Sequence, residues 1–303
     1  MMKIRINAKT TPELVEFKPK LDAGFNNFEI QLIRKYVLEN EYQETKEAIE
    51  KYGADISVVH TPLISEENGY GFEISLIHLL KKEYKKILED TCKYAQYISE
   101  IEKKRIKVVI HNDNSKQAFE YTGLIENKIG PFLKELLDKY YNVDFVVESS
   151  SVLGDLRFKS IFKMDDVAYV VSKLNNICAN RFYVVIDTCH EMMNNEAWKR
   201  FTYQELFDWN DEFKDSFNYG SKLGLIHLNN IWDNGVEEDH GRPFDIKHEG
   251  DLDKLKRIMN AYDRYANCEI TIEVKEDDYL DTPYNLIKTK EALETIGYKD
   301  LKI

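Results

Sequence analysis

The chain has little of what marks secreted, membrane-spanning or nucleic-acid-binding proteins. It contains only four cysteines among 303 residues, and none of them forms a CxxC pair, so we expect reduced thiols in a cytoplasmic protein. No apolar run approaches the roughly 18 residues of a membrane span. The N-terminal residues enter an alternating strand pattern directly and contain no signal-type apolar segment. These absences predict a protein with no membrane partner.

Runs of one charge sign are also missing. The chain has 42 basic and 54 acidic residues, which gives a net charge of −12, and no run of five or more carries a single sign. A surface of this sign repels phosphate backbones unless bound cations reverse the field. Nucleic acid is therefore disfavoured as a partner, and a small-molecule ligand is favoured.

Short β-branched runs alternate with segments of helical periodicity along the whole chain. Eight such βα units in about 300 residues predict a single (β/α)8 TIM barrel that spans residues 1–303. A doubly wound open sheet is the alternative, but it would begin with a glycine-rich phosphate turn, and the expected first turn at residues 8–11 has no glycine. The predicted strands are Lys3–Asn7, Phe28–Gln31, Ile56–His60, Lys107–His111, Asp144–Glu148, Phe182–Asp187, Leu225–Asn229 and Ile270–Val274.

Six successive predicted strands, the third to the eighth, each carry a metal-type ligand at or near the C-terminal end. In a TIM barrel these ends open onto one face, where the active site lies. Any one of these residues could be a solvated or hydrogen-bonded strand end, but burying six together is costly unless a cation compensates them. Mixed imidazole and carboxylate ligands without cysteine favour a catalytic site for Mn, Co, Mg or Zn. The residues are His60, His111, Glu148, Asp187, His227 and Glu273.

Some nearby residues have a less certain role. His190 lies three residues after Asp187, so it can bind substrate or a further metal, or it can cap the following helix. Lys275 projects to the same side as Glu273 and could pair with a carboxylate or bind substrate, although a solvated lysine is the simpler interpretation. His78 and His248 are expected to be solvated or core residues.

The strand-end pattern resembles the xylose isomerase-like TIM-barrel superfamily, which includes sugar isomerases, sugar epimerases and endonuclease IV. The segment from Ala23 to Glu29 also resembles the second-strand segment of that family, with Glu29 in its acidic position. The resemblance covers essentially the whole chain. It implies the barrel fold and a metal pocket, and it leaves the substrate open.

The sugar epimerase branch implies one divalent cation held by Glu148, Asp187, His227 and Glu273. The two glutamates would also act as acid and base on opposite faces of the substrate, through an enediolate, and His190 would contact a substrate oxygen. In the loop after the seventh strand, His240 and Arg242 would meet substrate oxygens or a phosphate. Trp232 and Phe244 would cover an apolar face of the sugar; a surface loop with a packed aromatic is the alternative.

The endonuclease IV branch implies up to three zinc ions and abasic DNA as substrate. His60 and His111 would be added ligands beside Glu148, and a third zinc would need His190 with an Asp-x-His pair. The chain offers Glu238-x-His240, with the spacing but not the aspartate, or Asp239 directly beside His240, so the pair is not matched cleanly. A metal-dependent subunit that cleaves C-glycosides is a further alternative. Neutral or acidic loops favour the sugar isomerase or epimerase, and barrel isomerases commonly form homo-oligomers.

Overall fold

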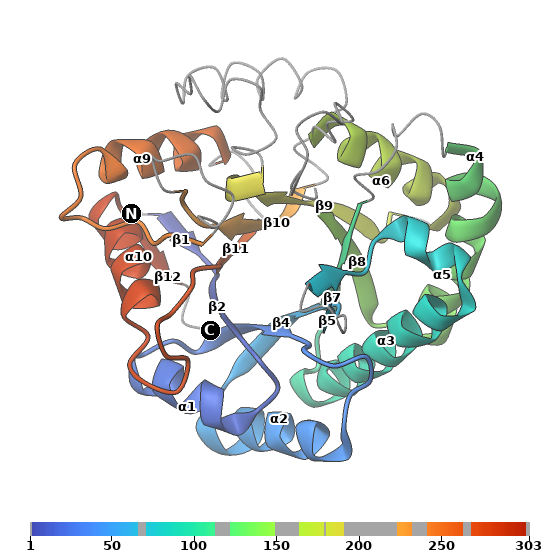
Figure 1. Ribbon diagram of the computed structural model, residues 1–303, viewed down its shortest axis with the longest axis horizontal. Helices are drawn as coiled ribbons and strands as arrows, with labels where there is room; N and C mark the ends of the chain where they lie inside the picture. Colours follow the sequence, from blue (N-terminus) through green and yellow to red (C-terminus); the bar gives the residue numbers. More distant parts are fainter. Residues whose placement is uncertain are drawn as a thin grey trace.

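Eight parallel strands close into a barrel, and helices pack around its outside (Figure 1). The computed structural model describes residues 2–65, 71–112, 122–148, 164–178, 180–190, 223–231, 241–262 and 268–300. The predicted TIM barrel is thereby confirmed, whereas the assignment of residues 1–303 to one domain stays a prediction. The barrel strands are β2 (Ile6–Thr10), β3 (Asn27–Gln31), β4 (Asp55–His60), β7 (Ile106–His111), β8 (Val143–Glu148), β9 (Phe182–Asp187), β10 (Leu223–Leu228) and β11 (Glu269–Ile272).

The helices follow the strands in the alternating order expected of a TIM barrel. Among the described residues, none of the helices is long and apolar enough to span a membrane. The main helices are α1 (Leu14–Asp22), α2 (Glu39–Tyr52), α3 (Lys82–Glu102), α5 (Gly130–Lys139), α6 (Met164–Cys178), α9 (Asp251–Tyr262) and α10 (Tyr284–Thr295). Shorter elements are β1 (Met2–Ile4), β5 (Leu63–Ser65), β6 (Gly71–Glu73), η1 (Leu76–Leu80), α4 (Thr122–Leu124), η2 (Ile125–Ile129) and β12 (Tyr298–Asp300).

The first barrel strand begins three residues later than the sequence pattern predicts. Residues 2–4 pair with β12 outside the barrel, and the barrel strand β2 runs from Ile6 to Thr10, where Ala8 lies opposite Phe28 of β3. The expected turn at residues 8–11 was therefore mostly wrong. The correction matters because it moves Lys9 and Thr10 to the C-terminal end of a barrel strand.

The interior of the barrel explains why the strand-end residues point inward. Five strands each place one apolar side chain in an inner cluster: Val58, Val109, Val146, Val185 and Leu225. Side chains two positions apart in a strand lie on the same face. The residues two positions further on therefore also face the interior, and they are His60, His111, Glu148, Asp187 and His227.

A second polar layer fills the opposite, N-terminal end of the barrel. Lys107 Nζ lies 2.9 Å from Glu269 Oε1, and the Ser57 hydroxyl donates a 2.6 Å hydrogen bond to Glu269 Oε2. Arg5 Nε lies 3.6 Å from the same carboxylate oxygen. Burial by itself raises the pKa of Glu269, but Lys107 and Arg5 outweigh it and lower that pKa to about 2. The layer is a half-buried ion-pair network at this end of the barrel.

Candidate functional site

Four predicted metal ligands converge at the C-terminal end of the barrel. Glu148, Asp187, His227 and Glu273 each offer one ligand atom, and these atoms lie within 4.8 Å of one another. His227 Nδ1 is 3.2 Å from Glu148 Oε2 and 3.0 Å from Glu273 Oε2. The first three side chains are almost completely buried. Barrel closure thus brings residues from four elements into one centre.

The donor atoms at this centre fit a metal ion. Glu148 Oε2, Glu273 Oε2 and His227 Nδ1 are buried, and within the described part of the chain they have no hydrogen-bond partner. Buried polar atoms are almost always paired, and each unsatisfied group costs free energy. Three such atoms facing one another are the ligand set that a divalent cation would satisfy, and nitrogen with carboxylate oxygen suits Mn, Co or Zn.

The electrostatics of the centre keep both glutamates ionised. Burial alone raises the pKa of Glu148, but His227 and His111 outweigh it and hold this pKa well below its usual range. Lys9 and His227 likewise lower the pKa of Glu273 against the effect of burial. Burial lowers the pKa of His227, but the surrounding glutamates outweigh it and raise this pKa well above its usual value. A metal would compete with that proton, because a ligating imidazole nitrogen must be unprotonated.

Glu29 on β3 orients the His227 ring from behind. His227 Nε2 is 3.1 Å from Glu29 Oε2, and the Thr271 hydroxyl donates a 2.7 Å hydrogen bond to the same oxygen. When Nε2 carries the proton that Glu29 accepts, Nδ1 presents its lone pair to the centre. The family resemblance put Glu29 in the acidic position of the second strand, but the sequence did not predict its contact with His227.

Asp187 is held in place by its own strand end and by the next strand. Its Oδ1 accepts the backbone N–H of His190 at 2.7 Å, and its Oδ2 accepts Asn229 Nδ2 at 3.0 Å. Residues 188–190 are helical, so Asp187, and not the His190 side chain, supplies the N-terminal cap. His190 Nδ1 instead lies 3.4 Å from Glu148 Oε1, at the centre. Sequence reasoning gave no role to Asn229, which directly follows β10 and fixes Asp187 from there.

His60 and His111 form a second potential ligand group that shares Glu148. Their Nε2 atoms lie 3.4 and 3.5 Å from Glu148 Oε2. His60 Nδ1 is 2.9 Å from the carbonyl oxygen of Thr61. A carbonyl can only accept, so Nδ1 carries a proton, and Nε2 is the ring nitrogen that faces Glu148. Both histidines are therefore placed where the sequence predicted them.

The structure does not bring every predicted substrate residue to the centre. Arg242 is buried and its Nη1 lies 3.0 Å from Asp251 Oδ1 at the start of α9. Phe244 is fully buried within the main hydrophobic core. Both side chains thus make packing contacts in the interior, and their role in substrate binding stays a prediction. Trp232, Glu238, Asp239 and His240 lie outside the described residues.

His78 and His248 were expected to be solvated or core residues, and their positions agree with this expectation. His78 is half-buried, and its Nδ1 accepts the backbone N–H of Ser75 at 3.1 Å. His248 is exposed and lies 3.2 Å from Asp251. Neither belongs to the centre.

Lys9 is a residue of the centre that sequence reasoning missed. Its Nζ lies 2.6 Å from Glu273 Oε1 and 3.8 Å from Glu29 Oε1. The prediction ended the first strand at Asn7, so Lys9 fell in a turn. The continued alternation of Ile6, Ala8 and Thr10 was the available signal.

A buried carboxylate and imidazole centre that could bind a metal ion lies at the C-terminal strand ends of this parallel barrel, where TIM barrels have their active sites. The family model described as xylose isomerase-like TIM barrel matches residues 20–296. The chain therefore belongs to the xylose isomerase-like TIM-barrel family. No curated protein matches it by sequence.

Several solved structures share the fold over nearly the whole chain. A D-tagatose 3-epimerase-like protein has a TM-score of 0.61 at 16% identity, over 96% of each chain. The IolI protein, solved with a zinc atom, has a TM-score of 0.60 at 12% identity, over 97% of this chain and 98% of that one. A sugar phosphate isomerase/epimerase from Parabacteroides distasonis has a TM-score of 0.56 at 13% identity, over 98% and 95%. At these identities the likeness concerns the fold.

Proposed function

We propose that this protein is a divalent-metal-dependent isomerase or epimerase that acts on a small carbohydrate or a sugar-like polyol. The observation that carries the proposal is the convergence of unsatisfied donor atoms from Glu148, His227 and Glu273, with Asp187 beside them. These four residues would hold one Mn, Co, Mg or Zn ion. The bound ion would polarise a substrate carbonyl and its neighbouring hydroxyl, which lowers the barrier to an enediolate.

In this proposal the two glutamates move the proton. Glu148 ends β8 and Glu273 follows β11, and β9 and β10 lie between these strands in the barrel, so the carboxylates reach the centre from different directions. Both are held ionised, so either can accept the α-proton. In an isomerisation the same glutamate would return this proton to the neighbouring carbon. In an epimerisation the other glutamate would first take up a proton from solvent and give it to the opposite face, and the first would release its proton to solvent. His190, 3.4 Å from Glu148 Oε1, is positioned to donate a hydrogen bond to a substrate oxygen.

Metal content and proton exchange test this proposal. We expect about one divalent cation per chain by elemental analysis of protein purified without an affinity metal, and exchange of the α-proton of a ketose in deuterated water. Glu148→Gln and Glu273→Gln should abolish exchange, because glutamine cannot take up a proton. Glu249→Gln is the matched control, since Glu249 is exposed. Full exchange activity in either active-site variant would refute the acid–base assignment.

A zinc phosphodiesterase is the second candidate, and the shared Glu148 favours it. Four carboxylates, those of Glu29, Glu148, Asp187 and Glu273, belong to the described centre, and the ammonium of Lys9 contacts two of them, Glu29 and Glu273. When the imidazoles are neutral, the charge of this group comes from its four carboxylates and one ammonium. One bound dication would then leave the group with one negative charge, whereas two bound dications would give it one positive charge. The second ion would use His60 and His111. Two to three zinc ions per chain, with cleavage of abasic DNA, would favour this candidate over the isomerase.

A further inference from the structure

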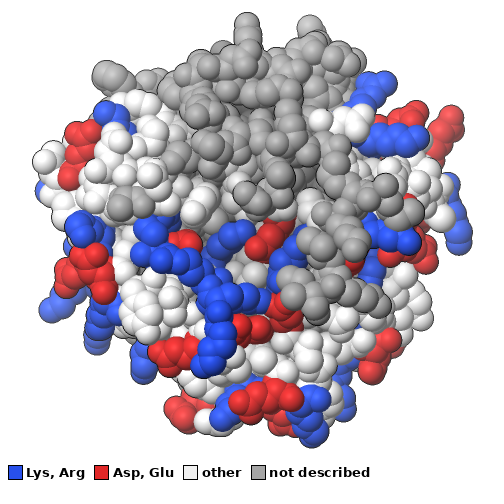
Figure 2. Space-filling view, turned by 180° about the vertical axis from the view of Figure 1, so that it is seen from behind, with Lys and Arg blue, Asp and Glu red and all other residues white. Residues whose placement is uncertain are grey.

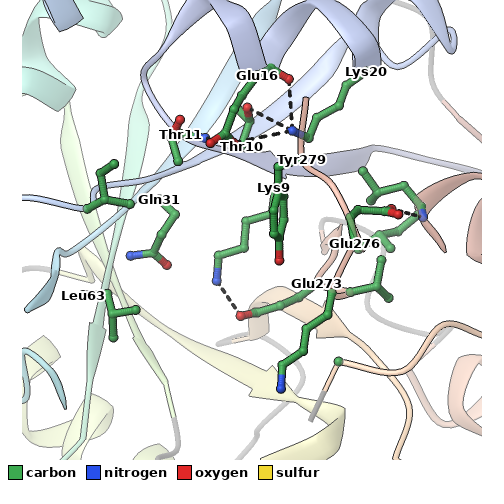
Figure 3. Close-up of a pocket in the computed structure, with 16 residues that line it drawn as sticks. Lys9, Thr10, Thr11, Glu16, Lys20, Gln31, Leu63, Glu273, Glu276 and Tyr279 are labelled. Atoms are coloured by element: carbon green, nitrogen blue, oxygen red, sulfur yellow. Dashed lines mark hydrogen bonds and ion pairs between the residues drawn. The ribbon is translucent and has the colours of Figure 1, made fainter. Parts of the chain in front are cut away.

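A cavity of about 500 Å³ opens beside Glu273. Its walls come from the ends of β2 and β3, from α1 and from the segment that follows β11 (Figure 3). Cavities of 300 to 1,000 Å³ are typical of small-molecule sites. Three lysines and three glutamates line it: Lys9, Lys20, Lys275, Glu16, Glu273 and Glu276. In Figure 2, basic side chains gather beside acidic ones near the central hollow of the face opposite to that of Figure 1.

Two of the three cavity carboxylates are satisfied by donors of the protein itself. Glu276 accepts the backbone N–H groups of Asn285 and Leu286 at 3.0 and 2.8 Å. Glu16 lies 3.7 Å from Lys20, and the backbone N–H of Thr11 also donates to it at 3.3 Å. Both carboxylates therefore already have hydrogen-bond donors within the wall.

The third carboxylate, Glu273, connects the cavity to the proposed metal centre. Lys9 pairs with its Oε1, while its Oε2 faces His227. A cation bound at Oε2 would draw on the same carboxylate charge that now balances Lys9. Positive charge would then increase where the cavity meets the centre, and an anion placed there would gain Coulomb energy.

The cavity also offers an oriented acceptor for a hydroxyl group. Gln31 Nε2 donates to the carbonyl oxygens of Leu32 and Thr61, at 3.1 and 2.8 Å. With both amide protons used, the Gln31 carbonyl oxygen turns toward the cavity and Lys9 (Figure 3). Lys275, exposed at the rim, is held by its backbone N–H bond to the Gly241 carbonyl at 2.9 Å.

We propose that this cavity binds the acidic group of a polyhydroxylated substrate, with Lys9 and Lys275 facing the anion and Gln31 accepting a substrate hydroxyl. The substrate class is thus an anionic sugar, whose charge comes from a carboxylate or a phosphate. The inference rests on the proposed metal-dependent function, because the ion at Glu273 is what makes Lys9 available to an anion. Lys9 and Lys275 are specificity-determining residues in this scheme.

Calorimetric binding of three six-carbon polyols to the metal-saturated full chain tests the inference. D-gluconate, D-glucitol 1-phosphate and D-glucitol differ only in the group at carbon 1, which carries a carboxylate, a phosphate or a hydroxyl. We expect one of the two anions to bind at least about tenfold more tightly than D-glucitol, as charge-assisted hydrogen bonds would give. The preferred anion identifies the source of the charge. Equal affinity for all three polyols would overturn the proposal.

Variants separate the lysines from the metal. Lys9→Met should remove most of the preference for the anion at saturating metal, and Lys9→Arg should restore part of it because the charge is kept. If Lys9→Met fails to fold, Lys275→Met tests the proposal independently, because it should also weaken the preference for the anion. Lys46→Met, an exposed lysine of α2, is the control. An unchanged preference in both Lys9→Met and Lys275→Met would overturn the proposal.

The same samples distinguish this inference from the function on which it rests. Bound metal and α-proton exchange together with equal polyol affinities would refute only the anion site. A lysine-dependent anion preference in a protein without α-proton exchange would support the site and refute the isomerase.

Discussion

Replacing Glu269 by glutamine should cost much of the stability that the N-terminal layer of the barrel supplies. Lys107 and Arg5 share this carboxylate, and its pKa falls from an ordinary 4.5 to about 2. Each unit of that difference is worth about 1.4 kcal/mol, so the ionised group stabilises the fold by about 3 kcal/mol at pH 7. Glu269→Gln should lose about this amount, because the two cations then lack their counter-ion.

The pH dependence gives the sharper test. A carboxyl whose pKa is lower in the folded state stabilises the protein above its unfolded pKa, and this stability is lost as the pH falls toward the folded pKa. The window here runs from pH 4.5 down to about 2. By pH 3, about 2 of the 3 kcal/mol should be gone. The difference in the free energy of unfolding between wild type and Glu269→Gln should therefore become smaller as the pH falls.

Urea denaturation of both proteins from pH 7 to pH 3 measures this difference in unfolding free energy. The other carboxylates are the same in both proteins, so their contributions to it cancel. Glu249→Gln, which changes an exposed carboxylate, should stay within about 0.5 kcal/mol of wild type. A gap below about 1 kcal/mol at pH 7, or one that does not shrink toward pH 3, would refute the reasoning about the ion-pair layer.

Three further predictions concern the functional face. Glu29→Gln weakens the acceptor that orients His227, so metal affinity should fall about 10- to 100-fold in a chelator competition assay; unchanged affinity would mean that the contact does not orient the ring. His60→Asn should leave metal content and activity nearly intact if one ion binds, and should remove an ion by elemental analysis if two bind. Gly241→Ala forces a side chain onto a backbone with φ of +88°, so urea denaturation should show a loss of about 1 to 3 kcal/mol. Gly123→Ala, which meets open space, should show no such loss.

Much of the centre could be predicted because strand periodicity is local. A strand that places Val146 inside the barrel must also place Glu148 inside, two residues later. The same argument holds for the pairs that end at His111 and Asp187. The confirmed barrel then requires these ends to share one face, which is why the predicted ligands meet.

The residues that act through distant contacts could not be predicted in this way. Lys9 was missed because the first barrel strand was placed three residues too early. The register of that strand, β2, is set by its pairing with β3 and β11. The side-chain bond from Asn229 to Asp187 depends on how neighbouring strands align. The burial of Phe244 depends on packing against elements far along the chain.

The sequence by itself determined the alternation of strands and helices, the barrel, the family and the identity of the inward-facing strand-end residues, because each follows from local periodicity and residue chemistry. Only the tertiary structure decided which atoms face one another. It placed Glu29 behind His227, Lys9 against Glu273 and the cavity beside them. These contacts join residues up to 264 positions apart, and their geometry is set when the barrel closes.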